Sequence, residues 1–482
     1  MSASALSPAL SASQAPLWQR FLGALISNEP FSASRNFLIS SLIWLVFGTV
    51  AGLIAGALMT WPDLIVNLGQ LSFGRVRPAH TNLVTLGWLS MGYVGCYFYL
   101  LPILVGRKAL WNERLGNITM IAWNLIVLLG VSGLLNGYTE AREYAELQGP
   151  FDWLVMLGLL LTAVNAYMTV ITGPEKKWYV TIWYILGSLF WFPLVYLIGN
   201  RAFLSFEGLN DAIAGWFYGH NILGMWFTVG GVGILYYLLP RFTGNPLYSH
   251  TLSMIGFWTI GMFYAPTGTH HVLQSPVPEW LKAIAVISSV FLLVPVLTVL
   301  TNFFMTLKGK WSLAADHIPL RFVISAGIAY LLTCVQGPFQ ATRGINWYIH
   351  FSNWVVGHAH LALLATFSFI VFAAIYYIIP KITGKKIYSK KMAVWHFWLS
   401  LYGWIIMMIS LTIAGLIQAA GWHFAIPVDQ WVIEQHPYMI VRFISGVLIV
   451  LGQVIFAYNI YQTVFGKDTE ALTESSSGIT YV

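Results

Sequence analysis

The segment VVGHAHLALL, residues 355–364, carries His358 and His360 two positions apart within a long apolar run. Successive residues of an α-helix are rotated by about 100°, so side chains two positions apart point to opposite sides of the helix. His358 and His360 therefore cannot both bind one metal ion. They can instead serve two different centres, one on either side of the same helix.

The composition around this segment is that of an all-α integral membrane protein. The 482 residues are 58% hydrophobic and only 9% charged, whereas a soluble domain is roughly 25% charged. Apolar runs of about 20 residues, each long enough to cross the bilayer as a helix, recur along the whole chain. We predict twelve such spans, over residues 36–60, 82–104, 116–137, 151–172, 178–200, 214–239, 252–272, 282–306, 320–336, 354–379, 392–418 and 438–463.

The spans define one helical domain, residues 36–465, between polar tails at 1–35 and 466–482. The first tail lacks the charged start and apolar core of a signal peptide. With twelve spans both termini lie on one side, and 17 of the 24 Lys and Arg residues fall in the loops and tails of that side. The positive-inside rule then predicts that both termini are cytoplasmic. The net charge of +7 needs no nucleic acid to explain it.

Other sequence features exclude several kinds of site. Cys96 and Cys334 stand in separate apolar segments without a CxxC or CxxCH motif, so a disulfide framework is not expected and c-type haem is not attached to this chain. We find no Gly-rich phosphate loop and no internal repeat strong enough to use.

Six of the twelve histidines gather at one depth of the predicted bundle. Even-numbered spans begin, and odd-numbered spans end, at the outer face, and these histidines lie near that end of their spans: His80, His220, His270, His271, His358 and His360. Ionisable groups inside a membrane are costly and usually functional. A single histidine there is more often a hydrogen-bonded structural residue, but six in one layer, with an HH and an HxH pair, favour metal binding.

The layer suggests two haems and a third metal. An axial imidazole in a bundle core suits haem, so two haems would flank the HxH helix, with His80 completing the coordination of one of them. His220, His270 and His271 form a three-imidazole set that suits copper, or less specifically zinc or iron. We expect a solvated role at helix ends or loops for His250, His317, His396, His423 and His436, while His350 is intermediate.

At these residues the sequence resembles the catalytic subunit of the haem-copper oxidases, most closely the cbb3-type cytochrome c oxidases. The motifs GRVRPAHTN, REYAE, YGHN, YAPTGTHH and GHAH occur in the order typical of that family. The resemblance covers essentially the whole chain and implies a twelve-transmembrane-helix haem-copper oxidase bundle.

The resemblance also implies roles for individual residues. His80 and His360 would hold the low-spin haem b, His358 the high-spin haem b, and His220, His270 and His271 one copper ion. Tyr264 matches the active-site tyrosine, which in the family is cross-linked to the copper ligand corresponding to His220. Arg77 and His350 resemble partners of the haem propionates. Glu143 matches a ligand of structural calcium, although an ion pair with Arg142 or Arg77 is an equal alternative. Ser253 fits a hydroxyl of the proton path, and helix packing is an equal alternative.

Three positions depart from the family pattern. Gln336 replaces a glutamate that supports the proximal histidine, Gly256 replaces a histidine of the proton path, and Asn353 replaces an aspartate. Gln336 cannot ionise, so it could orient His358 but would lower its basicity.

The implied activity is that of a terminal oxidase in a bacterial inner membrane, which reduces O₂ to water and translocates protons. Its electrons would come from a membrane-anchored c-type cytochrome subunit. The alternative within the superfamily is a nitric oxide reductase with iron in place of copper. Those reductases have a carboxylate four residues after the histidine of the sixth span, where this chain has Gly224. A transporter would leave the six histidines unexplained, and no pair of broken-helix repeats supports it.

Overall fold

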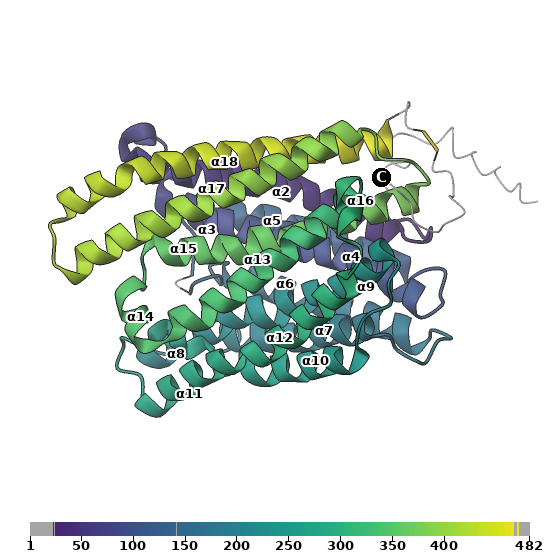
Figure 1. The fold of residues 1–482 in the computed structure, drawn as a ribbon, viewed down its shortest axis with the longest axis horizontal. Coiled ribbons are helices and arrows are strands. Elements are labelled where there is room, and N and C mark those ends of the chain that lie inside the picture. The colour runs from purple at the N-terminus through teal and green to yellow at the C-terminus, as the bar shows by residue number, and fades with distance from the viewer. Residues whose placement is uncertain (1–22, 24, 141, 467–469, 472–482) are drawn as a thin grey trace, which may run out of the picture.

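The computed structural model describes residues 23, 25–140, 142–466 and 470–471. These residues form helices and connections, with isolated β-bridges as the only strand-like pairing among them. Most of both predicted tails lies outside the described residues. The helices, shown in Figure 1, are α2 (Ser32–Thr60), η1 (Pro62–Ile65), η2 (Gly69–Leu71), α3 (Phe73–Asn82), η3 (Leu83–Ser90), α4 (Met91–Leu104), α5 (Glu113–Leu135), α6 (Gly149–Ile171), α7 (Val180–Gly199), α8 (Gly208–Asn221), η4 (Ile222–Thr228), α9 (Val229–Thr243), α10 (His250–Tyr264), η5 (Gly268–Val272), α11 (Glu279–Phe291), α12 (Leu293–Leu307), η6 (Trp311–Ala315), α13 (Ile318–Ala341), α14 (Arg343–Ile349), α15 (Asn353–His360), η7 (Leu361–Ser368), α16 (Phe369–Thr383), α17 (Lys390–His423) and α18 (Val428–Phe465).

The helical membrane fold is confirmed, and the number of long spans is close to the prediction. Within the described residues, 11 helices are long and apolar enough to cross a membrane. The predicted span 252–272 differs, because α10 has 15 residues and ends at Tyr264. Pro266 follows, and since proline lacks an N–H it interrupts the hydrogen-bond ladder. The chain turns there and forms the short 3₁₀ helix η5. The first span also begins earlier than predicted, at Ser32.

Three interrupted helices form the centre of the bundle. In each, an α-helix continues through a π-helical segment into a second α-helix: α3–η3–α4, α8–η4–α9 and α15–η7–α16. Their apolar windows are 94%, 94% and 83% buried, whereas those of the other long helices are 33–61% buried. His80, His220 and His360 lie just before the three π-helical segments. π-Helical turns are frequent at functional sites because they change the direction in which nearby side chains point.

The structure also reveals a threefold repeat, which corrects our expectation that no usable repeat is present. The segments PRFTGNPLYS (240–249) and PKITGKKIYS (380–389) share P, T, G, Y and S, and Gly244 and Gly384 both end a helix with φ near the left-handed region, 72° and 64°. Three times, an asparagine forms the same pair of hydrogen bonds with the backbone of the residue before an earlier helix: Asn165 with Asn112 before α5, Asn302 with Ser249 before α10, and Asn459 with Ser389 before α17. The shared contacts indicate three related helix groups around one centre.

Candidate metal and haem site

Three imidazoles converge between α8 and η5. The ligand nitrogens of His220, His270 and His271 all lie within 4.8 Å of one another, and the Nδ1 of His220 is 3.1 Å from the Nε2 of His271. Imidazoles that share one metal through bonds of about 2.1 Å have nitrogens within about 4 Å of each other. The three side chains could therefore hold one metal ion with small adjustments.

Two local features bring η5 to this position. At Gly268 a Cβ atom would lie 2.4 Å from the carbonyl oxygen of Trp216, so only glycine lets the backbone of η5 pack this closely on α8. The ring of His271 then stacks on Trp216, with centroids 4.0 Å apart. Ser289 accepts a hydrogen bond from His270 Nδ1 at 2.7 Å, which leaves the Nε2 of His270 free. Sequence reasoning missed Ser289, and only its place opposite η5 reveals it.

His80 and His360 face each other across a narrow gap. Their ring centroids are 6.3 Å apart and the ring planes differ by 14°. The Nδ1 of His80 is 2.7 Å from the Gly48 carbonyl oxygen, and the Nδ1 of His360 is 2.8 Å from that of Val356. Because carbonyl oxygens only accept, each Nδ1 is the protonated nitrogen and each Nε2 is free to bind a metal. Two axial imidazoles on one iron, with bonds of about 2.1 Å, have centroids roughly 6 Å apart, so the pair fits a six-coordinate haem.

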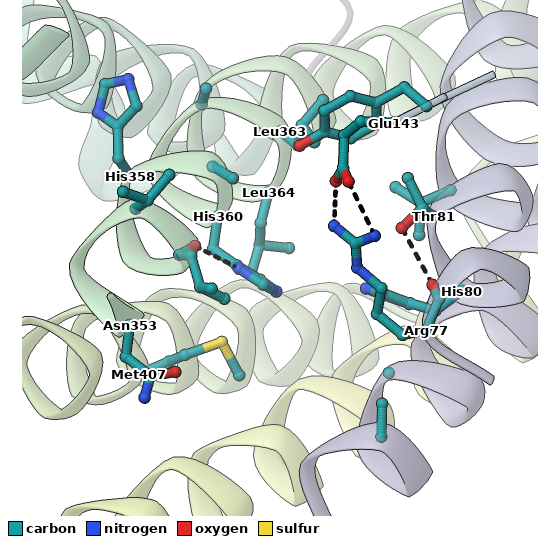
Figure 2. A pocket seen from close by; sticks show the side chains of 18 of the residues that line it. Arg77, His80, Thr81, Glu143, Asn353, His358, His360, Leu363, Leu364 and Met407 are labelled. Atoms are coloured by element: carbon teal, nitrogen blue, oxygen red, sulfur yellow. Dashed lines mark hydrogen bonds and ion pairs between the residues drawn. The ribbon is translucent and has the colours of Figure 1, made fainter. Parts of the chain in front are cut away.

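His358 points to the other side of α15. Figure 2 shows the side chains of His358 and His360 directed to different sides of the helix, with His360 toward His80. The Nδ1 of His358 lies 2.9 Å from Gln336 Oε1. The amide oxygen therefore accepts the Nδ1 proton and leaves Nε2 free, which is the orienting contact that the sequence predicted for Gln336.

One cavity joins these side chains. It has a volume of about 450 Å³, and its lining includes His80, His360, His358, His270 and His271. Arg77, Glu143 and His350 also line it. Burial lowers the pKa of His350, which favours its neutral form. The cavity is thus a single space with imidazoles from α3, α15 and η5 on its walls.

The Gln336 contact leads to a testable expectation. Gln336→Glu should lower the midpoint potential of a haem held by His358, because a carboxylate adds negative charge and makes the imidazole a stronger ligand. A hydrogen bond stronger by about 1–2 kcal/mol corresponds to a shift of roughly 40–90 mV for a one-electron couple. Spectroelectrochemical titration measures it, and an unchanged potential would mean that Gln336 does not contact His358 in the working enzyme.

Tyr264 lies beside the three-imidazole set. Its ring centroid is 5.5 Å from that of His220, and the buried Nε2 of His220 has no hydrogen-bond partner. A Cβ atom at Gly224 would lie 2.1 Å from Tyr264 Cδ1, well inside van der Waals contact. The Tyr264 ring therefore occupies the space that any larger residue at position 224 would need.

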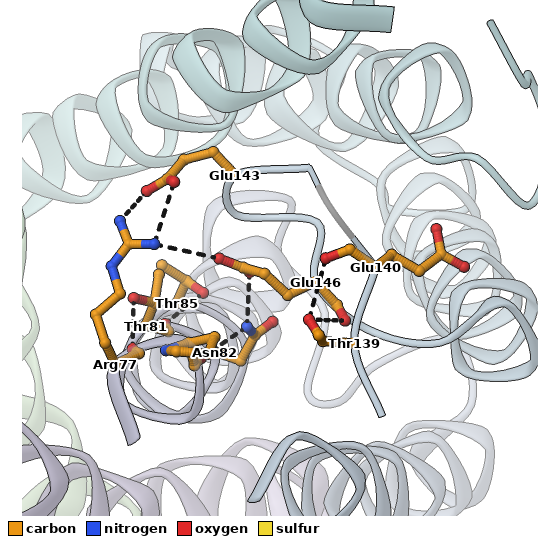
Figure 3. A network of polar contacts seen from close by, with 9 residues as sticks. Arg77, Thr81, Asn82, Thr85, Thr139, Glu140, Glu143 and Glu146 are labelled. Carbon is orange, nitrogen blue, oxygen red and sulfur yellow. Dashed lines mark hydrogen bonds and ion pairs between the residues drawn. The ribbon is translucent and has the colours of Figure 1, made fainter. Parts of the chain in front are cut away.

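The outer rim of the cavity carries charged groups, drawn in Figure 3. Arg77 forms an ion pair with Glu143 and lies 3.9 Å from Glu146, while Arg142 pairs with Asp211 instead. The carboxylate of Glu143 therefore pairs with Arg77 and not with Arg142. Glu146 is 6% exposed, and burial, followed by the charge of Glu143, raises its pKa to about 7.

Several hydroxyl groups lie around Ser253 and Gly256. Ser253 is buried; its hydroxyl donates to the Ser249 carbonyl oxygen and accepts from Asn302 at 3.0 Å. A Cβ atom at Gly256 would lie 2.7 Å from Thr298 Oγ1 and 3.0 Å from the Tyr184 hydroxyl. These hydroxyls fill the space that a histidine side chain at position 256 would need. Asn353 donates to Gln418 through its backbone N–H and its amide.

Two of the remaining histidines, His396 and His317, are buried, whereas we expected them at the surface. His396 is fully buried within α17 and stacks on Phe456, with centroids 4.3 Å apart. His317 is 3% exposed and caps α13 by accepting a hydrogen bond from the Leu320 N–H. The prediction failed because the boundaries of the spans, and hence the depth of these residues, were judged from hydropathy alone.

The long apolar helices and the buried group of three imidazoles describe a multi-pass membrane protein with side chains that could hold metal ions. Comparison with known proteins gives the family. Residues 32–448 match the family described as Cytochrome C and Quinol oxidase polypeptide I. The chain belongs to this family, the subunit I of the haem-copper oxidases, and the family implies haem and copper.

Individual relatives support the cbb3-type resemblance. The chain is 30% identical over 452 residues to the cbb3-type cytochrome c oxidase subunit CcoN1 of Stutzerimonas stutzeri, covering 90% of this chain and 95% of that protein. It is 24% identical over 470 residues to a subunit of the nitric oxide reductase of the same organism, covering 89% and 94%. A solved heme-copper terminal oxidase dimer has the same fold, with a TM-score of 0.77 at 15% identity over 94% of this chain and 87% of that one.

Proposed function

We propose that this chain is the catalytic subunit of a terminal respiratory oxidase that reduces O₂ to water. The observation that carries the proposal is the Tyr264 ring, which lies 5.5 Å from the His220 ring and fills the space at Gly224. A phenol in this position can supply both a proton and an electron. Tyr264 would act beside the metal, and the free Nε2 of His220 would carry a covalent bond to it.

The ligand assignments follow the imidazole geometry. His80 and His360 would hold the low-spin haem b, His358 the high-spin haem b, and His220, His270 and His271 the copper ion. When bound, the two haems and the copper would supply electron transfer and O₂ binding. The contacts of Nδ1 with Gly48, Val356 and Gln336 fix the ring orientations and keep each Nε2 deprotonated.

Polar groups on two sides would serve these centres. Arg77 and His350, both in the cavity wall, would contact the haem propionates, and Glu143 would bind calcium when that ion displaces its pairing with Arg77. On the other side, a proton path could use hydroxyl groups in place of a histidine at position 256. These hydroxyls belong to Ser253, Tyr184 and Thr298.

The membrane arrangement of the enzyme follows from charge and from the missing haem-attachment motif. We infer that both termini are cytoplasmic in a bacterial inner membrane, since 17 of the 24 Lys and Arg residues belong to that side. Because the chain has no CxxCH motif, a membrane-anchored c-type cytochrome subunit would deliver the electrons. Oxygen reduction would be coupled to proton translocation.

Nitric oxide reduction is the second candidate, favoured by the similarity to the nitric oxide reductase of Stutzerimonas stutzeri. The reductases have a carboxylate at the position of Gly224. Here a Cβ atom at that position would overlap the Tyr264 ring, so the two arrangements exclude each other. The packing of Tyr264 therefore supports the oxidase.

Gas consumption by the purified complex tests the proposal. With reduced cytochrome c as donor, we expect O₂ consumption to be at least tenfold faster than NO consumption at equal gas concentration. The reason is that the Tyr264 phenol is needed for the four-electron reduction of O₂ and not for the two-electron reduction of NO. Clark-type O₂ and NO electrodes measure both rates. A complex that consumes NO rapidly and O₂ only slowly would instead be a nitric oxide reductase.

A further inference from the structure

One buried imidazole takes no part in the candidate metal and haem site. His396 lies on α17 six residues after Lys390, about 9 Å along the helix from that end. Its ring is buried among the rings of Phe322, Phe372 and Phe456, with centroids 4.9, 4.6 and 4.3 Å away. An ionisable side chain inside a membrane is costly and usually functional. His396 therefore needs an explanation beyond packing.

The polar atoms of His396 and its neighbours are only partly paired. The Nδ1 of His396 lies 3.1 Å from the Tyr376 hydroxyl oxygen, and Gln453 on α18 donates through Nε2 to the Ser400 hydroxyl at 3.0 Å. Three further atoms are buried and have no hydrogen-bond partner within the described part of the chain: His396 Nε2, Gln453 Oε1 and Trp404 Nε1. Buried polar groups are nearly always paired, with protein or with ordered water, and a buried water typically joins about three of them. The unpaired atoms therefore indicate ordered water between α17 and α18.

The polar side chains lie on one side of α17 and lead to the cavity. Spacings of seven, four and seven residues, which are close to whole helical turns, separate Ser389, His396, Ser400 and Met407. At one end Ser389 is half-buried at the start of α17. At the other end Met407 lines the cavity, as does Ile449, one turn from Gln453 on α18. The row thus spans the distance from the end of the bundle that carries the lysine-rich connections to the cavity.

The internal repeat shows that the shared helix contacts do not require this imidazole. The segments SHTLSMIGFW (249–258) and SKKMAVWHFW (389–398) have the same S, F and W at their first, ninth and tenth positions. Gly256 and His396 both stand at the eighth position. The second helix group forms its asparagine contact with glycine there, and the third forms the same contact with histidine. The imidazole is therefore an addition to the third group and not a requirement of its packing.

We propose that this row conducts protons from the cytoplasmic side to the cavity through Tyr376, His396, Gln453, Ser400 and Trp404, with His396 as the relay. The inference rests on the proposed function, because the reduction of O₂ to water consumes protons. A proton that reaches the Tyr376 oxygen releases the hydroxyl proton to His396 Nδ1, and the imidazole releases its Nε2 proton to water beside Gln453. The imidazole gains one proton and loses one, no electron moves, and a turn of the ring restores the starting tautomer. Neutral imidazole suits this step because one nitrogen accepts while the other donates.

Proton uptake by the complete complex tests the relay. With the complex in phospholipid vesicles, cytoplasmic side outward, a pH-sensitive dye outside follows proton uptake when the reduced enzyme meets O₂. His396→Gln should slow this uptake at least tenfold and leave the haem spectra unchanged, because an amide cannot accept and release the proton at two ring nitrogens. Tyr376→Phe, which removes only a hydroxyl, should slow it as well. The control Tyr377→Phe should keep the wild-type rate, since that ring contacts Tyr99 and Tyr237. Wild-type uptake in both His396→Gln and Tyr376→Phe would overturn the proposal.

A second measurement does not depend on activity. Electron cryo-microscopy of the complete complex, at a resolution that shows water, should find ordered water within hydrogen-bond distance of His396 Nε2 and Gln453 Oε1, and again at Trp404 Nε1. A direct hydrogen bond between His396 and Gln453, with no water at Trp404, would contradict the proton path whatever the activity. A wild-type complex that consumes no O₂ would contradict the proposed function itself, whereas wild-type O₂ consumption with unslowed proton uptake in the two variants would contradict this inference alone.

Discussion

Tyr264→Phe is expected to reduce O₂ consumption at least a hundredfold while the protein keeps its fold and both haem spectra. The substitution retains the ring that packs against Gly224 and His220, so only one polar contact is lost, at a cost of about 1 kcal/mol. Splitting O₂ in one step needs four electrons and a proton, and the metals alone fall one electron short. A hundredfold loss corresponds to about 2.7 kcal/mol of activation free energy.

The matched control removes another buried hydroxyl, that of Tyr97 on α4, whose partner is Ser188. Tyr97→Phe should retain wild-type O₂ consumption. NO reduction needs only two electrons and should be less affected in Tyr264→Phe. In the unmodified protein, mass spectrometry should find peptides containing Tyr264 and His220 as one species, two hydrogen masses lighter than their sum. Full O₂ turnover in Tyr264→Phe would refute the role of the tyrosine.

Substitutions of the HxH pair are expected to remove different haem signals. His358→Ala should abolish the high-spin spectrum and leave the low-spin bands largely intact, whereas His80→Ala and His360→Ala should abolish the low-spin bands. The reason is that His358 and His360 point to different sides of α15, and only His360 faces His80 across the 6.3 Å gap. Optical and electron paramagnetic resonance spectra of the purified complexes distinguish these cases.

His250→Ala is the control, because His250 is exposed at the start of α10, outside the cavity. It should leave both spectra unchanged. If all three ligand substitutions removed the same band to the same extent in folded protein, the assignment of two separate haem centres would be wrong.

The part of the site that depends on local geometry could be predicted from the sequence. The opposite directions of His358 and His360 follow from the rotation per residue in any helix, and the common depth of the histidines follows from counting spans. The contact between Gln336 and His358 was expected from the family pattern and is confirmed at 2.9 Å. The first two features are set by the geometry of one helix and by the order of the helices, whereas the contact of Gln336 with His358 joins α13 to α15 and was expected only from the resemblance.

Other features depend on contacts between distant segments and could not be predicted. The early end of α10 and the close approach of Gly268 to Trp216 decide how His270 and His271 reach His220. Hydropathy predicted only one continuous span there. The burial of His396 among aromatic rings likewise depends on α18, 60 residues further along the chain at Phe456. Comparing residues 240–249 with 380–389 indicates two of the three repeats, but the third becomes visible only in the contact of Asn165 with Asn112.

The metal content of the purified complex tests the central claim most directly. Haem b assayed as its pyridine derivative, together with iron and copper measured by inductively coupled plasma mass spectrometry, should give two haem b and one copper per copy of this chain, after the c-type haem of the partner is subtracted. The three imidazoles of His220, His270 and His271, with nitrogens within 4.8 Å of one another, are the copper site in this account. Two haem b with no copper and one additional iron would contradict it and would identify a nitric oxide reductase.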